Sequence, residues 1–304
     1  MSILFALLID RWWGEPASVL HPVVWMGRYL GGLGERLPDY RPAAAFVLGA
    51  AYWLAGAILV ALAYGYAGFA LAKLPPWLDS VLTAVLLKPL FALKMLLGEV
   101  AAVEDSLMRG VEQGRVRLSR IVSRDTTRLD SGEIRESALE SLAENLSDSV
   151  VAPLFWFALF GLAGAAVYRF ANTADAMWGY RDRREWSGKF AARMDDLLNL
   201  IPARLTALLL LLMGPNRMTW LRRLPGEAAR TASPNSGWPM AALALSLGVR
   251  LRKPGVYELN AGGLEPSATD VSTGLRRVER TAWLAAGVLA LASVRHGGIG
   301  HAWY

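Results

Sequence analysis

Residues 43–72 read AAAFVLGAAYWLAGAILVALAYGYAGFALA and carry no charged side chain. A helix needs about 20 consecutive apolar residues to cross the hydrocarbon core of a bilayer, and this run exceeds that length. Residues 80–98 are again mostly apolar, although they include Lys88 and Lys94. The first run therefore predicts an integral membrane protein. The second predicts a returning helix that its two lysines make a poorer span, one packed inside the bundle.

The composition agrees with a membrane protein. Hydrophobic residues make up 54% of the chain and charged residues 19%. The net charge of +6 fits cytoplasmic loops, which accumulate Lys and Arg beside anionic lipid, and no basic module with stacking aromatics indicates a nucleic-acid partner. The absence of cysteine excludes disulfides, thiolate catalysis and thiolate metal ligands. We predict an all-α, polytopic helical bundle in a bacterial inner (plasma) membrane.

Residues 99–148 are the largest water-facing part of the sequence. Acidic and basic side chains alternate here with helical spacing, which is typical of a solvated helix. We predict a polar, mainly helical insertion on the cytoplasmic side, between membrane segments of a single membrane-embedded domain that covers residues 1–304. Residues 149–168 then form another uncharged run that is long enough to span a bilayer.

Charged, amide and hydroxyl side chains gather at both ends of the run 149–168. They are Ser137, Glu140, Glu144 and Asp148 before it, and Arg169, Asn172 and Asp175 after it. Helical spacing places Glu140 and Glu144 on one face, and charge at the edge of a bilayer indicates a functional site. A solvated amphipathic helix and a snorkelling arginine are the structural alternatives. If the run crosses fully, its ends face opposite sides, so either it is re-entrant or only one end is catalytic.

A third polar group lies in the segment ARMDDLLNLIPAR, which leads into another apolar run. Its members are Arg193, Asp195, Asp196, Asn199 and Arg204. Helical spacing places either aspartate on the same face as Asn199. Mg²⁺ prefers such sparse oxygen ligands, with phosphate and water completing the octahedron, and arginines bind phosphate or carboxylate oxygens. Pairing of Asp with Arg for structure alone is the alternative.

Two further signals are weaker. The uncharged loop SPNSGWPM, with Ser233 and Asn235, leads into a helix N-terminus, where backbone N–H groups can bind anions. His21 is the only histidine outside the C-terminal tail and could ligate a metal or transfer a proton near neutral pH. A lone histidine more often has a structural role. Both signals therefore give candidate binding positions only.

These segments form a series of motifs that covers nearly the whole chain. The motifs are DRWWGEP from Asp10, HPVVWMG from His21, SRDT from Ser123, ESLAENLSDSVVAPLFW from Glu140, YRFANTADAMWGY from Tyr168, ARMDDLLNLIPAR from Ala192 and SPNSGWPMAA from Ser233. In this order they resemble the cobalamin-biosynthesis membrane protein family that includes adenosylcobinamide-phosphate synthase. Each motif is modest alone, and the ordered series makes the resemblance specific.

The resemblance implies an amide-forming ligase that acts on a corrinoid. The family joins the free propionate of adenosylcobyric acid to aminopropanol or aminopropanol phosphate. It implies ATP as cosubstrate and Mg²⁺, with an acyl phosphate as the economical route to the amide. The chain has no P-loop (GxxxxGK[ST]), so ATP would bind on another scaffold. Membrane lipid, other late cobalamin-pathway enzymes and a second copy of the chain are the partners expected, and the active site is expected to face the cytoplasm.

By residue type, the resemblance implies three sets of roles. The catalytic candidates are Glu140, Glu144, Asp148 and Asp175. The metal candidates are Asp195, Asp196 and Asn199. The candidates for binding substrate or phosphate are Arg124, Asp125, Arg169, Asn172, Arg193, Arg204, Ser233, Asn235 and His21.

Two other classes of function remain open on the sequence. A non-catalytic membrane scaffold or sensor would need no ATP, and a distantly similar branch of the family is linked with β-lactamase induction. A small-molecule transporter also uses intramembrane Asp and Arg. A transporter should carry its polar residues in the middle of its spans, whereas here they cluster at span ends. That placement favours an enzyme.

Overall fold

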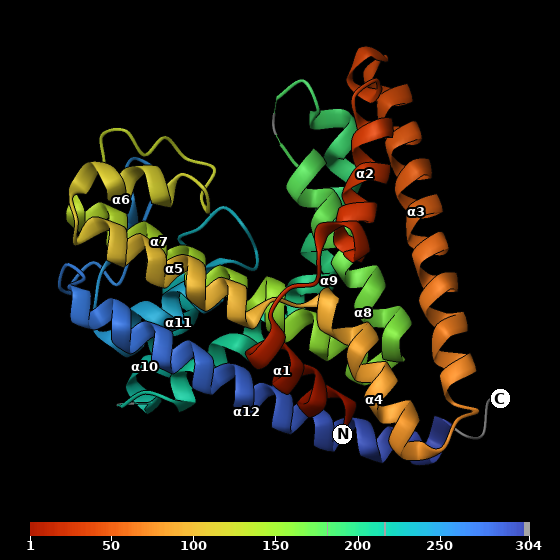
Figure 1. Cartoon of the computed structure of the whole chain (residues 1–304). Helices are drawn as coiled ribbons and strands as arrows, with labels where there is room; N and C mark the ends of the chain where they lie inside the picture. The colour runs from red at the N-terminus through yellow and green to blue at the C-terminus, as the bar shows by residue number, and fades with distance from the viewer. Residues whose placement is uncertain (181, 216, 301–304) are drawn as a thin grey trace. The chain divides into compact units, whose positions relative to one another are not determined.

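The computed structural model describes residues 1–180, 182–215 and 217–300 (Figure 1). Within these ranges it describes all side chains except those of Leu33, Arg217, Met218 and residues 294–300. The described chain is almost entirely helical, which confirms the predicted all-α class, and its strands form one short antiparallel hairpin.

The chain folds into two compact units. Unit 1 comprises Met1–Ala92, Ala152–Asn199 and the segment from Ala286, and unit 2 comprises Leu93–Val151 and Leu200–Ala285. The long helices α9 (Glu185–Leu212) and α12 (Ala268–Gly300) each contribute to both units. The single domain predicted over residues 1–304 stays a prediction.

Unit 1 is built around a long apolar helix. Its elements are α1 (Ser2–Trp13), η1 (Ser18–Leu20), α2 (Pro22–Gly34), η2 (Leu37–Asp39), α3 (Pro42–Leu71), α4 (Pro76–Leu87), η3 (Lys88–Leu90) and α8 (Ala152–Trp178). The long apolar helix is α3, which contains almost all of the uncharged run 43–72 and packs along α8. Gly56 permits the close approach, since a Cβ there would lie 2.3 Å from the Phe170 ring.

Helix α8 is broken in the middle of the run 149–168. Phe160 and Gly161 have non-helical backbone angles, and Gly161 has φ 61° and ψ −153°, a region open almost only to glycine. A Cβ at Gly164 would lie 2.4 Å from the Trp156 carbonyl oxygen, whereas residues eight apart in a straight helix are separated by about 12 Å. The chain therefore turns sharply at Gly161. A break of this kind is what a re-entrant segment requires, which is one of the two alternatives that the sequence left open for residues 149–168.

Unit 2 holds the polar segment and the hairpin. Its elements are α5 (Leu93–Leu107), α6 (Val111–Leu118), α7 (Ser131–Leu146), the π-turn η4 (Ser147–Val151), α10 (Arg217–Ala228), α11 (Gly237–Leu247), β1 (Leu251–Lys253) and β2 (Tyr257–Leu259). Helix α7 starts with a capping box, in which Asp130 and Glu133 satisfy each other's backbone N–H groups. It packs against α5, α6, α11 and β1, so acidic residues on it become buried.

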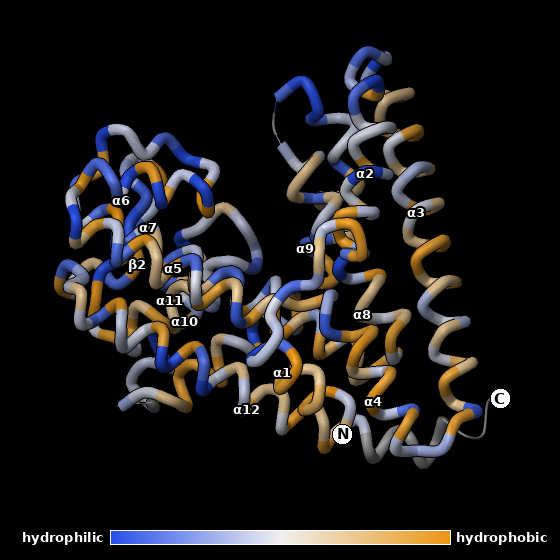
Figure 2. The backbone as a smooth tube through the Cα atoms, viewed as in Figure 1, coloured by the Kyte–Doolittle hydropathy of each residue, from blue (hydrophilic) through white to orange (hydrophobic). Residues whose placement is uncertain are grey.

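Among the residues that the structure describes, three stretches of helix are long and apolar enough to cross a membrane. They are Pro42–Leu71, Pro76–Leu107 and Ser131–Trp178. Figure 2 shows the hydrophobic character along α3 and the hydrophilic residues on α6 and the loops beside it. The second stretch is interrupted at Lys88 and the third at Gly161. These helices fit the predicted membrane protein.

Candidate functional site

A carboxylate cluster forms in unit 1 where the second half of α8 meets the start of α9. Asn172 Nδ2 donates to Asp195 Oδ1 at 3.4 Å, and Arg169 Nη1 lies 3.5 Å from Asn172 Oδ1. Asp175 lies one turn after Asn172 and is close enough to Asp196 for the two negative charges to repel each other. We call Asn172, Asp175, Asp195 and Asp196 the carboxylate cluster. The structure thus brings together residues that the sequence placed in two separate motifs.

The carboxylate cluster concentrates negative charge beside two arginines. Arg193 Nη1 lies 4.0 Å from Asp196 Oδ2. Burial raises the pKa of the Asp196 carboxyl above its usual value, although the Arg193 guanidinium acts in the opposite direction. Asn199, on the same helix, is buried. A bound cation would stabilise the charged form of such a buried carboxylate.

The carboxylate cluster offers too few ligands to hold a hard cation unless other ligands complete the coordination shell. Among the described residues, no group of three or more His, Cys, Asp or Glu side chains is arranged to hold a metal ion. The cluster supplies carboxylate and amide oxygens, the ligands that Mg²⁺ takes when phosphate and water complete its shell. These residues do not form a closed metal cage, and their oxygens suit Mg²⁺ only where phosphate and water supply the other ligands.

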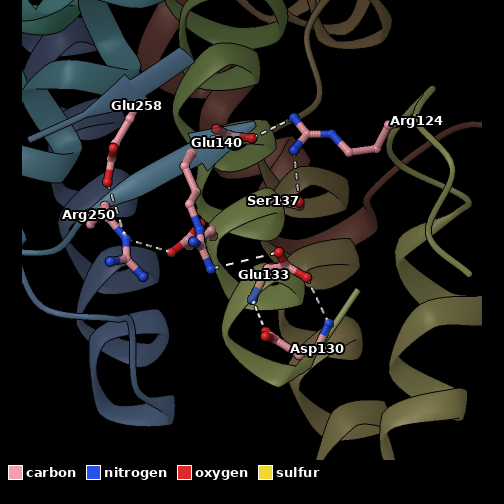
Figure 3. A network of polar contacts seen from close by, with 9 residues as sticks. Arg124, Asp130, Glu133, Ser137, Glu140, Arg250 and Glu258 are labelled. Atoms are coloured by element: carbon pink, nitrogen blue, oxygen red, sulfur yellow. Dashed lines mark hydrogen bonds and ion pairs between the residues drawn. The ribbon is translucent and has the colours of Figure 1, made fainter. Parts of the chain in front are cut away.

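A second polar cluster lies in unit 2 on the buried face of α7. Arg124 Nη2 lies 2.5 Å from Glu140 Oε2, and Arg124 Nη1 donates to Ser137 Oγ at 3.0 Å (Figure 3). Burial, followed by the negative charge of Glu140, raises the pKa of Tyr257, so this phenol stays a proton donor. We call Arg124, Ser137, Glu140 and Tyr257 the Arg124–Glu140 cluster. It joins the SRDT motif to α7, and Tyr257 is a member that the sequence did not indicate.

A pair of arginines from the hairpin meets the same face of α7. Glu136 is fully buried, and its two oxygens accept from Arg250 Nε at 3.3 Å and Arg252 Nε at 3.2 Å. Arg250 also lies 3.7 Å from Glu258 (Figure 3). The sequence analysis missed Glu136, Arg250 and Arg252. Glu136 precedes Glu140 by one helical turn, so that spacing was the one local signal for it.

The remaining candidates of unit 2 are less central. Glu144 is half-buried and its charge acts on Tyr257, while Asp148 lies half-buried in η4. Asp125 is exposed and accepts hydrogen bonds from the Thr127 N–H at 2.9 Å and the Thr127 hydroxyl at 2.8 Å, which hold the pKa of its carboxyl below the ordinary value. Asp125 therefore orders its own loop and lies outside the Arg124–Glu140 cluster.

Arg204 and the SPNSGWPM loop come together in unit 2. Arg204 Nη1 donates to Asn235 Oδ1 at 3.3 Å, and the guanidinium carbon lies 4.7 Å from the centre of the Trp238 ring. Ser233 Oγ accepts from the N–H groups of Asn235 and Ser236, both at 3.2 Å. The loop thus uses two of its N–H groups internally. Arg204 Nη1 also donates to the Leu200 carbonyl at 2.7 Å and Nη2 to the Pro234 carbonyl at 3.5 Å, so the protein itself engages both terminal nitrogens of this guanidinium.

His21 belongs to a buried ion network of unit 1. Its Nδ1 accepts from the Val23 N–H and caps α2, so Nε2 carries the proton of the neutral ring and donates to Glu15 at 3.0 Å. Lys88 Nζ lies 2.8 Å from Glu15 and 2.9 Å from Asp10. The side chain of Lys88 is therefore buried within unit 1, whereas Lys94 on the same predicted helix is exposed. This geometry gives His21 a structural role in the network.

Comparison with known proteins identifies relatives over the whole length. A family model described as CobD/Cbib protein matches residues 3–284. The chain is 45% identical to a probable cobalamin biosynthesis protein CobD of Thermococcus kodakarensis, covering 96% of both chains. It is 41% identical to a protein of the same name from Methanothermobacter thermautotrophicus, over 84% of this chain and 85% of that one. It is 38% identical to the cobalamin biosynthesis protein CobD of Rhodobacter capsulatus, over 91% and 92%. No solved structure matches the chain.

Proposed function

The chain belongs to the CobD/Cbib protein family, and from this premise we propose that it is the corrinoid ligase of cobalamin biosynthesis. In this proposal it joins the free propionate of adenosylcobyric acid to aminopropanol or aminopropanol phosphate. The relatives are named for the cobalamin pathway, and the long apolar helices suit a protein of the inner membrane. The proposed active site opens to the cytoplasm, where its soluble substrates are.

The carboxylate cluster is the observation that carries the proposal. Asn172 and Asp195 lie in contact, Asp175 lies close to Asp196, and Arg169 and Arg193 flank the group. Activation of a carboxylate by ATP brings several negative charges together, and such charge needs fixed cationic and hydrogen-bonding groups. Mg²⁺ held by Asp195, Asp196 and Asn199 would neutralise phosphate charge at this place when bound.

The proposed reaction has two steps, formation of an acyl phosphate and its attack by the amine. A propionate oxygen attacks the terminal phosphorus of ATP, ADP leaves, and an acyl phosphate forms. The amine nitrogen then attacks the acyl carbon, and phosphate leaves with its oxygen. The nitrogen must lose one proton to a base within hydrogen-bond reach. Asp175 is the base that we propose, because it lies in the same cluster as the metal candidates.

The Arg124–Glu140 cluster has a separate place in the proposal. Glu140 holds the Arg124 guanidinium in a fixed direction, and Tyr257 adds a proton donor beside it. A fixed guanidinium and a phenol can bind the carbonyl groups of an amide-rich substrate. Glu140 is thereby assigned to positioning Arg124.

The test uses the full chain in lipid nanodiscs. The protein receives adenosylcobyric acid, either aminopropanol or its phosphate, and Mg²⁺-ATP, and the amide product is measured by mass spectrometry. We expect product with one of the two amines. Asp196→Asn should lower the rate by about a hundredfold or more, since it removes a charge aimed at the reacting groups. Asp182→Asn is the matched control, because this carboxylate lies in the exposed loop between α8 and α9.

Two results would count against the proposal. Wild-type rates in Asp196→Asn would exclude the carboxylate cluster as the site. No product from the wild-type protein with either amine would instead favour a scaffold or sensor, and uptake of a corrinoid into sealed vesicles without amide formation would favour a transporter.

A further inference from the structure

An apolar pocket of about 380 Å³ lies within unit 1, between α2, α3, α4 and α8. Small side chains of α3, among them Ala63 and Ala67, leave the space. The rings of Tyr29 and Phe170 close it beside Gly56. We propose that this pocket binds one acyl chain of an anionic membrane phospholipid. The proposal concerns a site apart from the carboxylate cluster and does not depend on the ligase activity.

The lining of the pocket selects an apolar ligand. Tyr29 donates its hydroxyl to the Tyr52 carbonyl at 2.8 Å, and Trp25 Nε1 donates to the Val19 carbonyl at 2.9 Å. Their polar atoms are therefore already satisfied by the protein, and the rings present carbon to the pocket. A polar ligand would lose its hydration without gaining partners from these rings. Hydrocarbon suffers no such loss.

The bilayer is the source of that hydrocarbon. Helix α3 is long and apolar enough to cross a membrane, and its outward side chains Leu62 and Tyr66 are 67% and 75% exposed. Leu59 lines the pocket and is itself 62% exposed, so the pocket opens on the same surface. A lipid chain can thus enter sideways from the leaflet without leaving the hydrocarbon phase.

The length of the pocket matches one leaflet. Its lining positions on α3 run from Gly56 to Ala67, which spans about 16 Å at 1.5 Å per residue, and half of a hydrocarbon core of about 30 Å is about 15 Å. Because α3 is 30 residues long, it measures about 45 Å and extends past the core at both ends. Tyr64, about 10 Å before the end at Leu71, then lies near the hydrocarbon boundary.

The polar groups toward the end of α3 orient the lipid. The Tyr64 hydroxyl provides a hydrogen-bond donor at the depth of the ester carbonyls. Lys73 is exposed just after the helix, and its Nζ lies 4.3 Å from the centre of the Phe69 ring. A lysine at this position attracts the phosphate of an anionic headgroup. The acyl chain of the bound lipid therefore runs from the headgroup beside Lys73 toward Gly56.

The binding test uses the full chain in mild detergent and native mass spectrometry. Dioleoyl phosphatidylglycerol and dioleoyl phosphatidylcholine are the probes. We expect one tightly held phosphatidylglycerol per wild-type protein. Ala63→Trp fills the pocket and should lower this binding at least tenfold, whereas Leu62→Trp, on the outward face of the same helix, should change it less than twofold. Lys73→Gln should reduce the preference for phosphatidylglycerol about fivefold, as expected for one surface lysine.

A second measurement needs no variant and holds even if Ala63→Trp fails to fold. A phosphatidylglycerol with a diazirine in its acyl chain is crosslinked to the wild-type protein, and the labelled residues are mapped. Labelling at Leu59, Ala63 and Ala67 supports the pocket. Equal labelling of Leu62 and Tyr66, or unchanged phosphatidylglycerol binding by a folded Ala63→Trp variant, overturns the proposal. So does a lipid-free protein in which a second copy occupies this face.

Discussion

Replacement of Lys88 by methionine is expected to destabilise unit 1 strongly. Lys88 Nζ contacts Asp10 at 2.9 Å and Glu15 at 2.8 Å. The side chains of Lys88 and Asp10 are only 4% and 1% exposed. Methionine keeps much of the volume of lysine and removes the charge. The Asp10 carboxylate then stays buried without its lysine.

The size of the effect follows from the burial of the pair. Removal of one partner of a buried ion pair costs about 3–5 kcal/mol, because the other charge is left uncompensated in a poorly solvated place. Glu15 is 21% exposed and keeps its hydrogen bond from His21. Removal of the lysine therefore destabilises the Glu15 carboxylate less than the Asp10 carboxylate. We therefore expect a loss near the lower end, about 3 kcal/mol.

Unfolding in mixed micelles, titrated with a denaturing detergent, measures the free energy. The double variant Lys88→Met with Asp10→Asn should lose less than the sum of the single variants, with a coupling of about 0.5–3 kcal/mol. Lys94→Met is the matched control, since Lys94 is exposed on the same candidate span. A Lys88→Met variant within about 0.5 kcal/mol of the wild type, the range of ordinary surface substitutions, would refute the reasoning.

Two further predictions test the backbone break and the loop charge. Gly161→Ala should cost about 1–3 kcal/mol in the same unfolding assay, because alanine is strained at φ 61° and ψ −153°; Gly68→Ala, in α3 with open space around it, should cost nothing, and equal effects would contradict the break. Hydrogen bonds from Arg184 lower the pKa of Asp182 to about 2, so its contribution to loop order should persist above pH 4 and vanish as the pH falls through about 2. Carboxyl NMR titration checks this value, and an unchanged Asp182 pKa in Arg184→Gln would contradict the pairing.

The membrane character could be predicted from the sequence because hydrophobicity is a local property. Residues 43–72 have no charge, and α3 occupies almost the same range, Pro42–Leu71. Helical spacing is local too. It placed Glu140 and Glu144 on one face of a helix, and both lie in α7, although the spacing could not show that Glu140 is buried. The family was also within reach, since ordered motifs are a property of the sequence itself.

The partners of the charged residues could not be predicted in the same way. Asn172 in α8 contacts Asp195 in α9. Lys88 in η3 contacts Asp10 in α1, which is 78 residues earlier in the sequence. Glu136 accepts hydrogen bonds from two arginines, one in and one beside a hairpin that was not predicted from the sequence. Each of these pairings depends on which helix faces pack together.

The sequence by itself determined where the long apolar runs lie, that several can enter a membrane, and which motifs the chain shares with its relatives. The tertiary structure alone decided that the chain turns at Gly161 and which carboxylates share a cluster. The physical reason is range. Hydrophobic length and helical period are set by neighbouring residues, whereas a side chain's partner across the fold is set by packing summed over distant segments.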